Sequence, residues 1–256
     1  MSPSTRTVAP PDRPTRPTPA AERSRRLRAG WPSTVLAKWI MAVTGVIFAL
    51  FVLVHMIGNL KVYSGPEHFD AYALWLRTLL EPLLPYEGFL WIFRTVLLIC
   101  LVLHVWCAVV ITRRARIARG SHRRRGLRGM DSFAARTMPV TGIVLLLFIV
   151  FHLLDLTAGV GVAPEGFQHT TPEASHAYAN LVASFSRPWA AAVYIAAMVM
   201  LFLHLAHGLW SALCDVGITV AERVRGTVML LCGAYGLAVM IGNISIPLAV
   251  LTGVVR

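Results

Sequence analysis

Hydrophobic residues in this chain fall into five long runs with almost no charge inside them. A helix rises about 1.5 Å per residue, so roughly 20 such residues cross a hydrocarbon layer of about 30 Å. Continuous apolar runs are typical of membrane helices, whereas barrel strands would alternate. Pro139 and Pro188 stand at the beginning of the third and fourth runs, where a missing N–H does no harm. The pattern predicts an all-α integral membrane protein with helices over about 37–60, 89–112, 138–158, 188–212 and 226–252.

Composition agrees with a bilayer protein and excludes a soluble enzyme. Of the 256 residues, 56% are hydrophobic and only 14% are charged, whereas a soluble domain has about 25% charged residues. The mean hydropathy is +0.64. The formal net charge of +12 comes from arginines between the apolar runs, so it indicates membrane orientation and not a nucleic-acid partner.

The distribution of basic residues predicts which side each connection faces. Lysine and arginine gather before the first run and between the second and third, where residues 113–136 contain nine arginines. The positive-inside rule therefore places the amino terminus in the cytoplasm and the carboxyl terminus outside. Residues 1–34, rich in proline and arginine, are predicted to be a disordered cytoplasmic tail. Residues 35–256 are predicted to form the five-helix domain.

A sequence block recurs in the two halves of the chain. Val43-Thr44-Gly45, nine apolar residues and His55 correspond to Val140-Thr141-Gly142, nine apolar residues and His152. Each copy continues with an outer loop containing Pro-Glu and Ala-Tyr-Ala, and then with a helix that carries His104 or His204. We expect two parallel hairpin repeats with the fifth helix added. Short surface helices are predicted over 67–80 and 172–184.

The repeat sorts four histidines by depth. His55 and His152 fall near the outer ends of the first and third helices, and His104 and His204 fall near the inner ends of the second and fourth. Facing histidines in a helix bundle are the axial ligands of b-type haem. We therefore predict two haem b groups, with the small Gly45 and Gly142 making room at the inner level. His207 is the alternative inner ligand to His204.

Other polar side chains near the outer level are candidates for contacts with a quinone or with haem propionates. Arg94 lies ten residues before His104, Asp155 lies three residues after His152, and Glu87 is at the outer mouth of the second helix. Snorkelling of Arg94 and Glu87 towards water is an alternative for these two, and a structural pair between Asp155 and Arg94 is an alternative for the third. An inner-face quinone site involving Arg136 is also open.

The Val-Thr-Gly-x9-His block of the third helix and the segment His204-Leu-Ala-His-Gly-Leu-Trp-Ser carry a family resemblance. They resemble the single-chain, five-helix, dihaem cytochrome b subunit of succinate:menaquinone reductases and related fumarate reductases. In that family the helix 1 and helix 3 histidines bind the outer haem, and the helix 2 and helix 4 histidines bind the inner haem. The resemblance covers about residues 35 to 252, and it favours His204 over His207.

The resemblance implies a non-autonomous enzyme subunit in the cytoplasmic membrane of a bacterium. A flavoprotein with FAD and an iron–sulfur protein would dock on the cytoplasmic face, and electrons from succinate would reach menaquinone through the two haems. Phe202 stands where some fumarate reductases carry a glutamate for proton compensation, so that path is not expected. The alternatives are a dihaem anchor of a nitrate reductase or hydrogenase, and a haem-free proton-coupled transporter.

Overall fold

The computed structural model describes residues 32–119, 130–217 and 221–256, together with residues 18 and 22. Every regular element in these residues is a helix, which confirms the predicted all-α class. Five helices are long and apolar enough to cross a membrane. They are α2 (Thr34–Asn59), α4 (Gly88–Arg119), α5 (Met130–Leu153), α7 (Pro188–Asp215) and α8 (Glu222–Leu251). The predicted tail of residues 1–34 falls almost entirely outside the described residues.

The third predicted span, 138–158, corresponds to the apolar span Thr137–Ala158, but one of the two expected proline positions is wrong. Pro188 is at the first position of α7, as expected. Helix α5 begins at Met130, however, so Pro139 lies inside the helix and not in its first turn. The apolar run marks the part of the helix suited to lipid, and the backbone of α5 stays helical through the more polar residues before that run.

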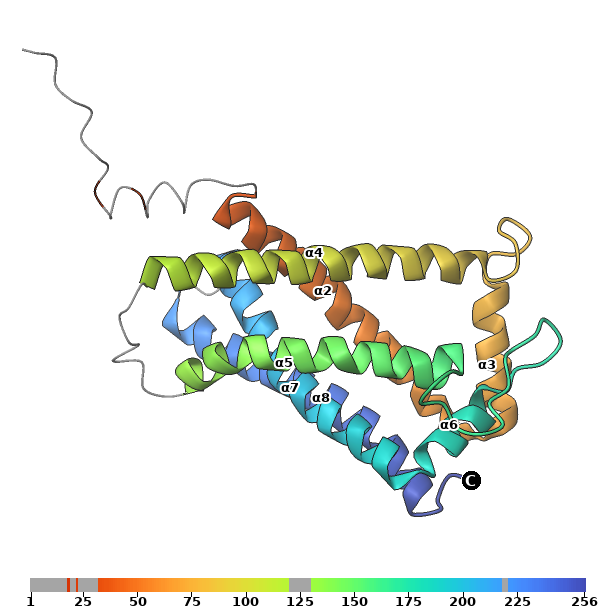
Figure 1. Ribbon diagram of the computed structural model, residues 1–256. Helices are drawn as coiled ribbons and strands as arrows, with labels where there is room; N and C mark the ends of the chain where they lie inside the picture. The colour runs from red at the N-terminus through yellow and green to blue at the C-terminus, as the bar shows by residue number, and fades with distance from the viewer. Residues whose placement is uncertain (1–17, 19–21, 23–31, 120–129, 218–220) are drawn as a thin grey trace, which may run out of the picture.

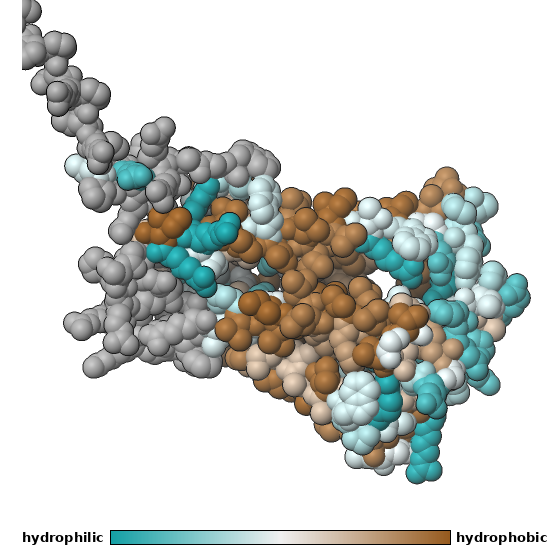
Figure 2. Space-filling model, in the orientation of Figure 1, coloured by the Kyte–Doolittle hydropathy of each residue, from teal (hydrophilic) through white to brown (hydrophobic). Residues whose placement is uncertain are grey.

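Successive long helices run in opposite directions, so the bundle has two distinct ends (Figure 1). We call the end that carries α3 (Pro66–Thr78), α6 (Ala177–Phe185) and the carboxyl terminus the outer end. The opposite end, where α2 begins and α7 ends, is the inner end. On the face shown in Figure 2, hydrophobic side chains cover the middle of the bundle and hydrophilic ones gather at the outer end. This is the surface expected for a chain surrounded by lipid.

Helix α7 is the centre of the packing. It packs against α8, α5 and α2, and α2 packs in turn against α4. Buried Ala190, Ala191 and Ala197 let the backbone of α7 approach its neighbours closely. Neither α2 and α5 nor α4 and α7 make extensive backbone contact within the described residues. These are the two helix pairs that carry the predicted histidine pairs.

A layer of short elements closes the outer end. It contains α3, α6, a 3₁₀ turn over Leu60–Ser64 (η1) and a π-helical turn over Leu154–Ala158 (η2). The surface helix predicted over 67–80 is therefore present as α3. The helix predicted over 172–184 starts only at Ala177, because Asp70 accepts hydrogen bonds from the Ser175 hydroxyl and the Tyr178 backbone N–H and so caps it there.

Candidate functional site

The outer site is a pair of facing imidazoles. His55 of α2 and His152 of α5 have ring centroids 5.9 Å apart, with the ring planes at 86°. Phe51 stands beside His55 at 5.3 Å and 28°, and Phe148 stands beside His152 at 5.9 Å and 30°. Each phenylalanine comes one helical turn before its histidine. The two halves of the chain thus offer the same aromatic support at this level.

The inner site is a second pair of imidazoles. His104 of α4 and His204 of α7 have centroids 6.4 Å apart and planes at 57°. The ring that faces His104 belongs to His204, one turn before His207. A Cβ added to Gly45 would lie 3.5 Å from Cε1 of His104, and one added to Gly142 would lie 3.6 Å from Cε1 of His204. Both glycines are therefore at the inner level, as their spacing predicts.

Threonine hydroxyls hold the two inner imidazoles. Thr44 Oγ1 lies 2.9 Å from Nδ1 of His104, and Thr141 Oγ1 lies 3.1 Å from Nδ1 of His204. Each hydroxyl donates its only hydrogen to a backbone carbonyl, that of Ile40 or Met138. The assignment that satisfies both contacts has the hydroxyl oxygen accepting a hydrogen bond from Nδ1–H of the imidazole. Nε2 is left as a free lone pair, the state of imidazole that binds metals.

His152 has a different partner. Its Nδ1 lies 3.3 Å from the hydroxyl oxygen of Tyr194 on α7, and that hydroxyl donates to Oδ2 of Asp155 at 2.9 Å. The same counting of hydrogens makes Nδ1 of His152 the donor and leaves its Nε2 free. His55 has no hydrogen-bond partner among the residues that the structure describes, so its support comes from the rings around it.

Asp155 is fully buried in η2 and pairs with Arg187, the residue that precedes α7. Arg187 Nη2 lies 2.6 Å from Oδ1 of Asp155, and the Ser184 hydroxyl donates to Oδ2. The Arg94–Asp155 pair considered above is not formed. Arg94 is half exposed and lies 3.9 Å from Glu87, with its guanidinium over the ring of Trp91.

Glu87 is the centre of a separate charge cluster at the outer end. It accepts a hydrogen bond of 3.0 Å from Nε of Arg77, on α3, and faces Arg94 with its other oxygen. Next to Arg94, Phe93 lies 5.7 Å from Phe51, which stacks on His55. Arg94 is therefore close to the level of the outer pair, as its spacing from His104 predicts.

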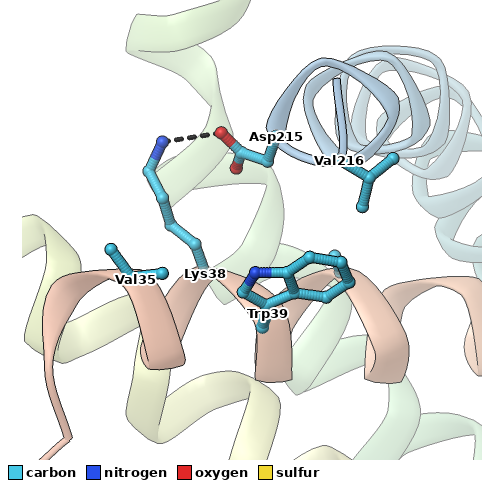
Figure 3. A pocket seen from close by; sticks show the side chains of 6 residues that line it. Val35, Lys38, Trp39, Asp215 and Val216 are labelled. Atoms are coloured by element: carbon cyan, nitrogen blue, oxygen red, sulfur yellow. Dashed lines mark hydrogen bonds and ion pairs between the residues drawn. The ribbon is translucent and has the colours of Figure 1, made fainter. Parts of the chain in front are cut away.

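A small pocket of about 180 Å³ lies at the inner end (Figure 3). Lys38 and Trp39 of α2 line it with Asp215 and Val216 at the end of α7. An ion pair of 2.7 Å between Lys38 and Asp215 spans the two helices. Arg136, the predicted inner-face candidate, has a side chain outside the described residues.

The donor set fits a group with one iron per histidine pair. A metal–imidazole bond of about 2 Å on both sides places two ring centroids roughly 6 Å apart, as at both levels. Clusters of three or more metal-binding side chains are absent from the described residues. Two imidazoles are nevertheless the full protein contribution to a six-coordinate haem.

Comparison with protein families finds a match over residues 113–242, just over half of the chain. The matching model describes the succinate dehydrogenase/fumarate reductase transmembrane subunit. The chain belongs to this family. No curated protein and no solved structure matched the chain.

As a succinate dehydrogenase/fumarate reductase transmembrane subunit, the chain is a multi-pass membrane component of an oxidoreductase complex. The matched region contains His152 and His204, whereas His55 and His104 precede it. The first-half histidines are thus linked to the second-half ones by geometry and by the internal repeat alone.

Sequence reasoning missed several side chains that surround the histidines of this transmembrane subunit. Thr44 and Thr141 served only as markers of the repeat. The paired phenylalanines were visible as a match at the same position of both blocks. Tyr194 lies ten residues before His204, just as Arg94 lies ten residues before His104. That spacing was the available signal for Tyr194.

Proposed function

We propose that this transmembrane subunit binds two b haems and carries electrons from succinate to menaquinone within a succinate dehydrogenase complex. His55 and His152 would hold the outer haem, and His104 and His204 the inner one. The observation that carries the proposal is the presence of two imidazole pairs at two depths, with Nδ1 engaged by a hydroxyl at three of the four rings.

The chain's own residues orient and insulate these ligands. The three hydroxyl partners fix the ring rotation and the tautomer, which leaves Nε2 directed to a metal. The sparse backbone contact between α2 and α5 and between α4 and α7 is compatible with a planar group held between each pair of histidines. When bound, the two haems would supply one-electron transfer along the bundle.

The proposed orientation puts the inner end in the cytoplasm. Lys38, Arg113, Arg114 and Arg116 are described side chains at or near that end, and the positive-inside rule favours it. A flavoprotein with FAD and an iron–sulfur protein would dock there, because family membership implies such partners. The cytoplasmic membrane of a bacterium is the proposed location.

Quinone is proposed to bind at the outer end, where Arg94 and Glu87 are partly exposed. A guanidinium there can polarise a quinone carbonyl, and a carboxylate can exchange its protons. Asp155 is fully buried and holds three donors, so it would have to break its pair with Arg187 to reach a quinone. The inner pocket is below the roughly 300–1,000 Å³ typical of small-molecule sites.

Purification of the complex through a tag on this chain tests the proposal. We expect a flavoprotein and an iron–sulfur protein in the preparation, and succinate-dependent reduction of a b-type absorption band. A molybdenum or nickel protein would favour a nitrate reductase or hydrogenase anchor. A preparation without a Soret band would contradict haem binding and favour the transporter alternative.

A further inference from the structure

We propose that Tyr194 is a positioning residue that transmits the negative charge of Asp155 to the ligand His152 and so lowers the reduction potential of the outer haem. The inference rests on the proposed function, since it needs a haem at the outer pair. It gives a further task to Tyr194, whose hydroxyl the haem-ligand proposal uses only to orient His152, and a first task to the ion pair of Asp155 and Arg187.

Three donors hold the carboxylate of Asp155. Its carboxylate receives Arg187 Nη2 on Oδ1, and the hydroxyls of Ser184 and Tyr194 on Oδ2. Arg187 also donates to the backbone carbonyls of Val162 and Ser184. The ion pair with Arg187 and the two hydroxyl hydrogen bonds fix this buried carboxylate in position.

The hydrogen bonds lead from His152 through Tyr194 to Asp155. Tyr194 has a single hydroxyl hydrogen, and Oδ2 of Asp155 takes it at 2.9 Å. The phenol oxygen, made more electron-rich by the carboxylate, is then the acceptor for Nδ1–H of His152 at 3.3 Å. An imidazole that donates to a more basic partner is itself a stronger donor to a metal.

Tyr194 and Asp155 are both held firmly in place by their surroundings. The Tyr194 ring is packed between Phe148, Phe151 and Phe185, with centroids 5.1, 5.7 and 4.7 Å away. The π turn that presents Asp155 ends at Gly159, where φ is +64° and the ring of Phe167 leaves no room for a Cβ. The hydroxyl therefore has little freedom to leave either partner.

The hydroxyls that contact His104 and His204 have no carboxylate partner. Thr44 and Thr141 pass their hydroxyl hydrogens to neutral backbone carbonyls, not to a carboxylate. His104 and His204 are thus oriented by a hydroxyl, as His152 is, but that hydroxyl is not bonded to a negatively charged group. The expected consequence is selective: stronger ligand donation stabilises ferric iron at the outer level only.

Tyr194→Phe in the complete complex is the decisive variant, because it keeps the ring and removes the hydroxyl. Tyr178→Phe is the matched control: it removes a buried hydroxyl in the same outer layer, bonded to the Arg256 carbonyl and not to a histidine. Redox titration of the haem absorption bands would be compared in the two variants and in the unmodified complex. The His55→Ala variant identifies which wave belongs to the outer haem.

We expect Tyr194→Phe to shift the one-electron equilibrium of the outer haem about tenfold towards ferrous iron, which is about 59 mV upward. The inner haem in that variant and both haems in Tyr178→Phe should keep their potentials. Selective loss of the outer haem would also support the positioning role. Two haems with unchanged potentials in Tyr194→Phe would overturn the relay while leaving the proposed function intact. An unmodified complex without haem would overturn both.

Discussion

The inner and outer histidine pairs are built from equivalent positions of the two halves, yet they are supported differently. At the inner level, both rings are held by a threonine of the same sequence block, Thr44 or Thr141. At the outer level, His152 is linked to a buried ion pair through Tyr194, whereas His55 is supported by aromatic rings. The inner level keeps the twofold pattern of the sequence, and the outer level departs from it.

The two halves differ at the outer level because they carry different residues at one equivalent position. Ten residues before the inner histidine stands Arg94 in the first half and Tyr194 in the second. The arginine reaches outward to Glu87 and stays half exposed, whereas the tyrosine turns inward to Asp155. The repeated sequence pattern therefore keeps the histidines at both levels, and the different residues at this position give the two halves different contacts at the outer end. The predictions below test this division.

Loss of a ligand should have the largest effect. His55→Ala or His152→Ala removes one of two imidazoles at the outer level, so the outer haem should be lost and the inner one kept. His104→Ala should do the reverse. Haem content of the purified complex, measured as the pyridine haemochrome, checks both. Loss of both haems, or of neither, in any one of these variants would break the assignment of pairs.

A bulky side chain at the inner level should prevent binding of the inner haem and leave the outer haem bound. Gly142→Leu extends a side chain towards the ring of His204, which already lies 3.6 Å from the added Cβ. The inner haem should then be lost by steric conflict while the outer haem remains. Gly233→Leu on α8 is the control, because a Cβ there has nothing within 4 Å. Equal haem content in the two variants would show that Gly142 does not border the inner site.

Breaking the buried ion pair should destabilise the outer end. Arg187→Met leaves the Asp155 carboxylate buried without its cation, which costs about 3–5 kcal/mol. The complex should denature at a lower temperature and lose the outer haem before the inner one. Adding Asp155→Asn removes the unpaired charge and should recover most of the loss. A double variant no more stable than Arg187→Met would contradict a charge effect.

The smallest effect is expected at the inner hydroxyls. Thr141→Val keeps the shape of the side chain and removes the acceptor for Nδ1–H of His204, a net loss of about 1 kcal/mol. The inner haem should remain bound with a modestly altered potential, and the outer haem should not change. Thr44→Val should behave alike, because its contact with His104 is the same. Redox titration of both variants checks the expected symmetry.

Much of the architecture could be predicted from the sequence, because lipid imposes a simple rule on apolar length. The five helices, the alternating directions and the levels of Gly45 and Gly142 depend on helical rise and hydropathy alone. The start of α5 at Met130 could not be read this way, since a helix can continue beyond its apolar run. Arg136 and the tail of residues 1–34 stay predictions outside the described residues.

The ligand neighbourhood was less accessible from sequence. Asp155 was correctly singled out as a special group, but its partner is Arg187 and not Arg94. The two partners are 32 residues apart in sequence. The intervening loop and α6 bring them together, and no periodicity encodes that approach. The hydrogen bond from Tyr194 to Asp155 likewise joins α7 to a π turn that no sequence periodicity indicates.

The haem content of the unmodified complex tests the central claim most directly. The account predicts two b-type haems for each copy of this chain by the pyridine haemochrome assay, with two separate waves in a redox titration. A single haem would contradict the equivalence of the two levels. A complex with its flavoprotein and iron–sulfur partners but no haem would contradict the claim that these histidines bind iron.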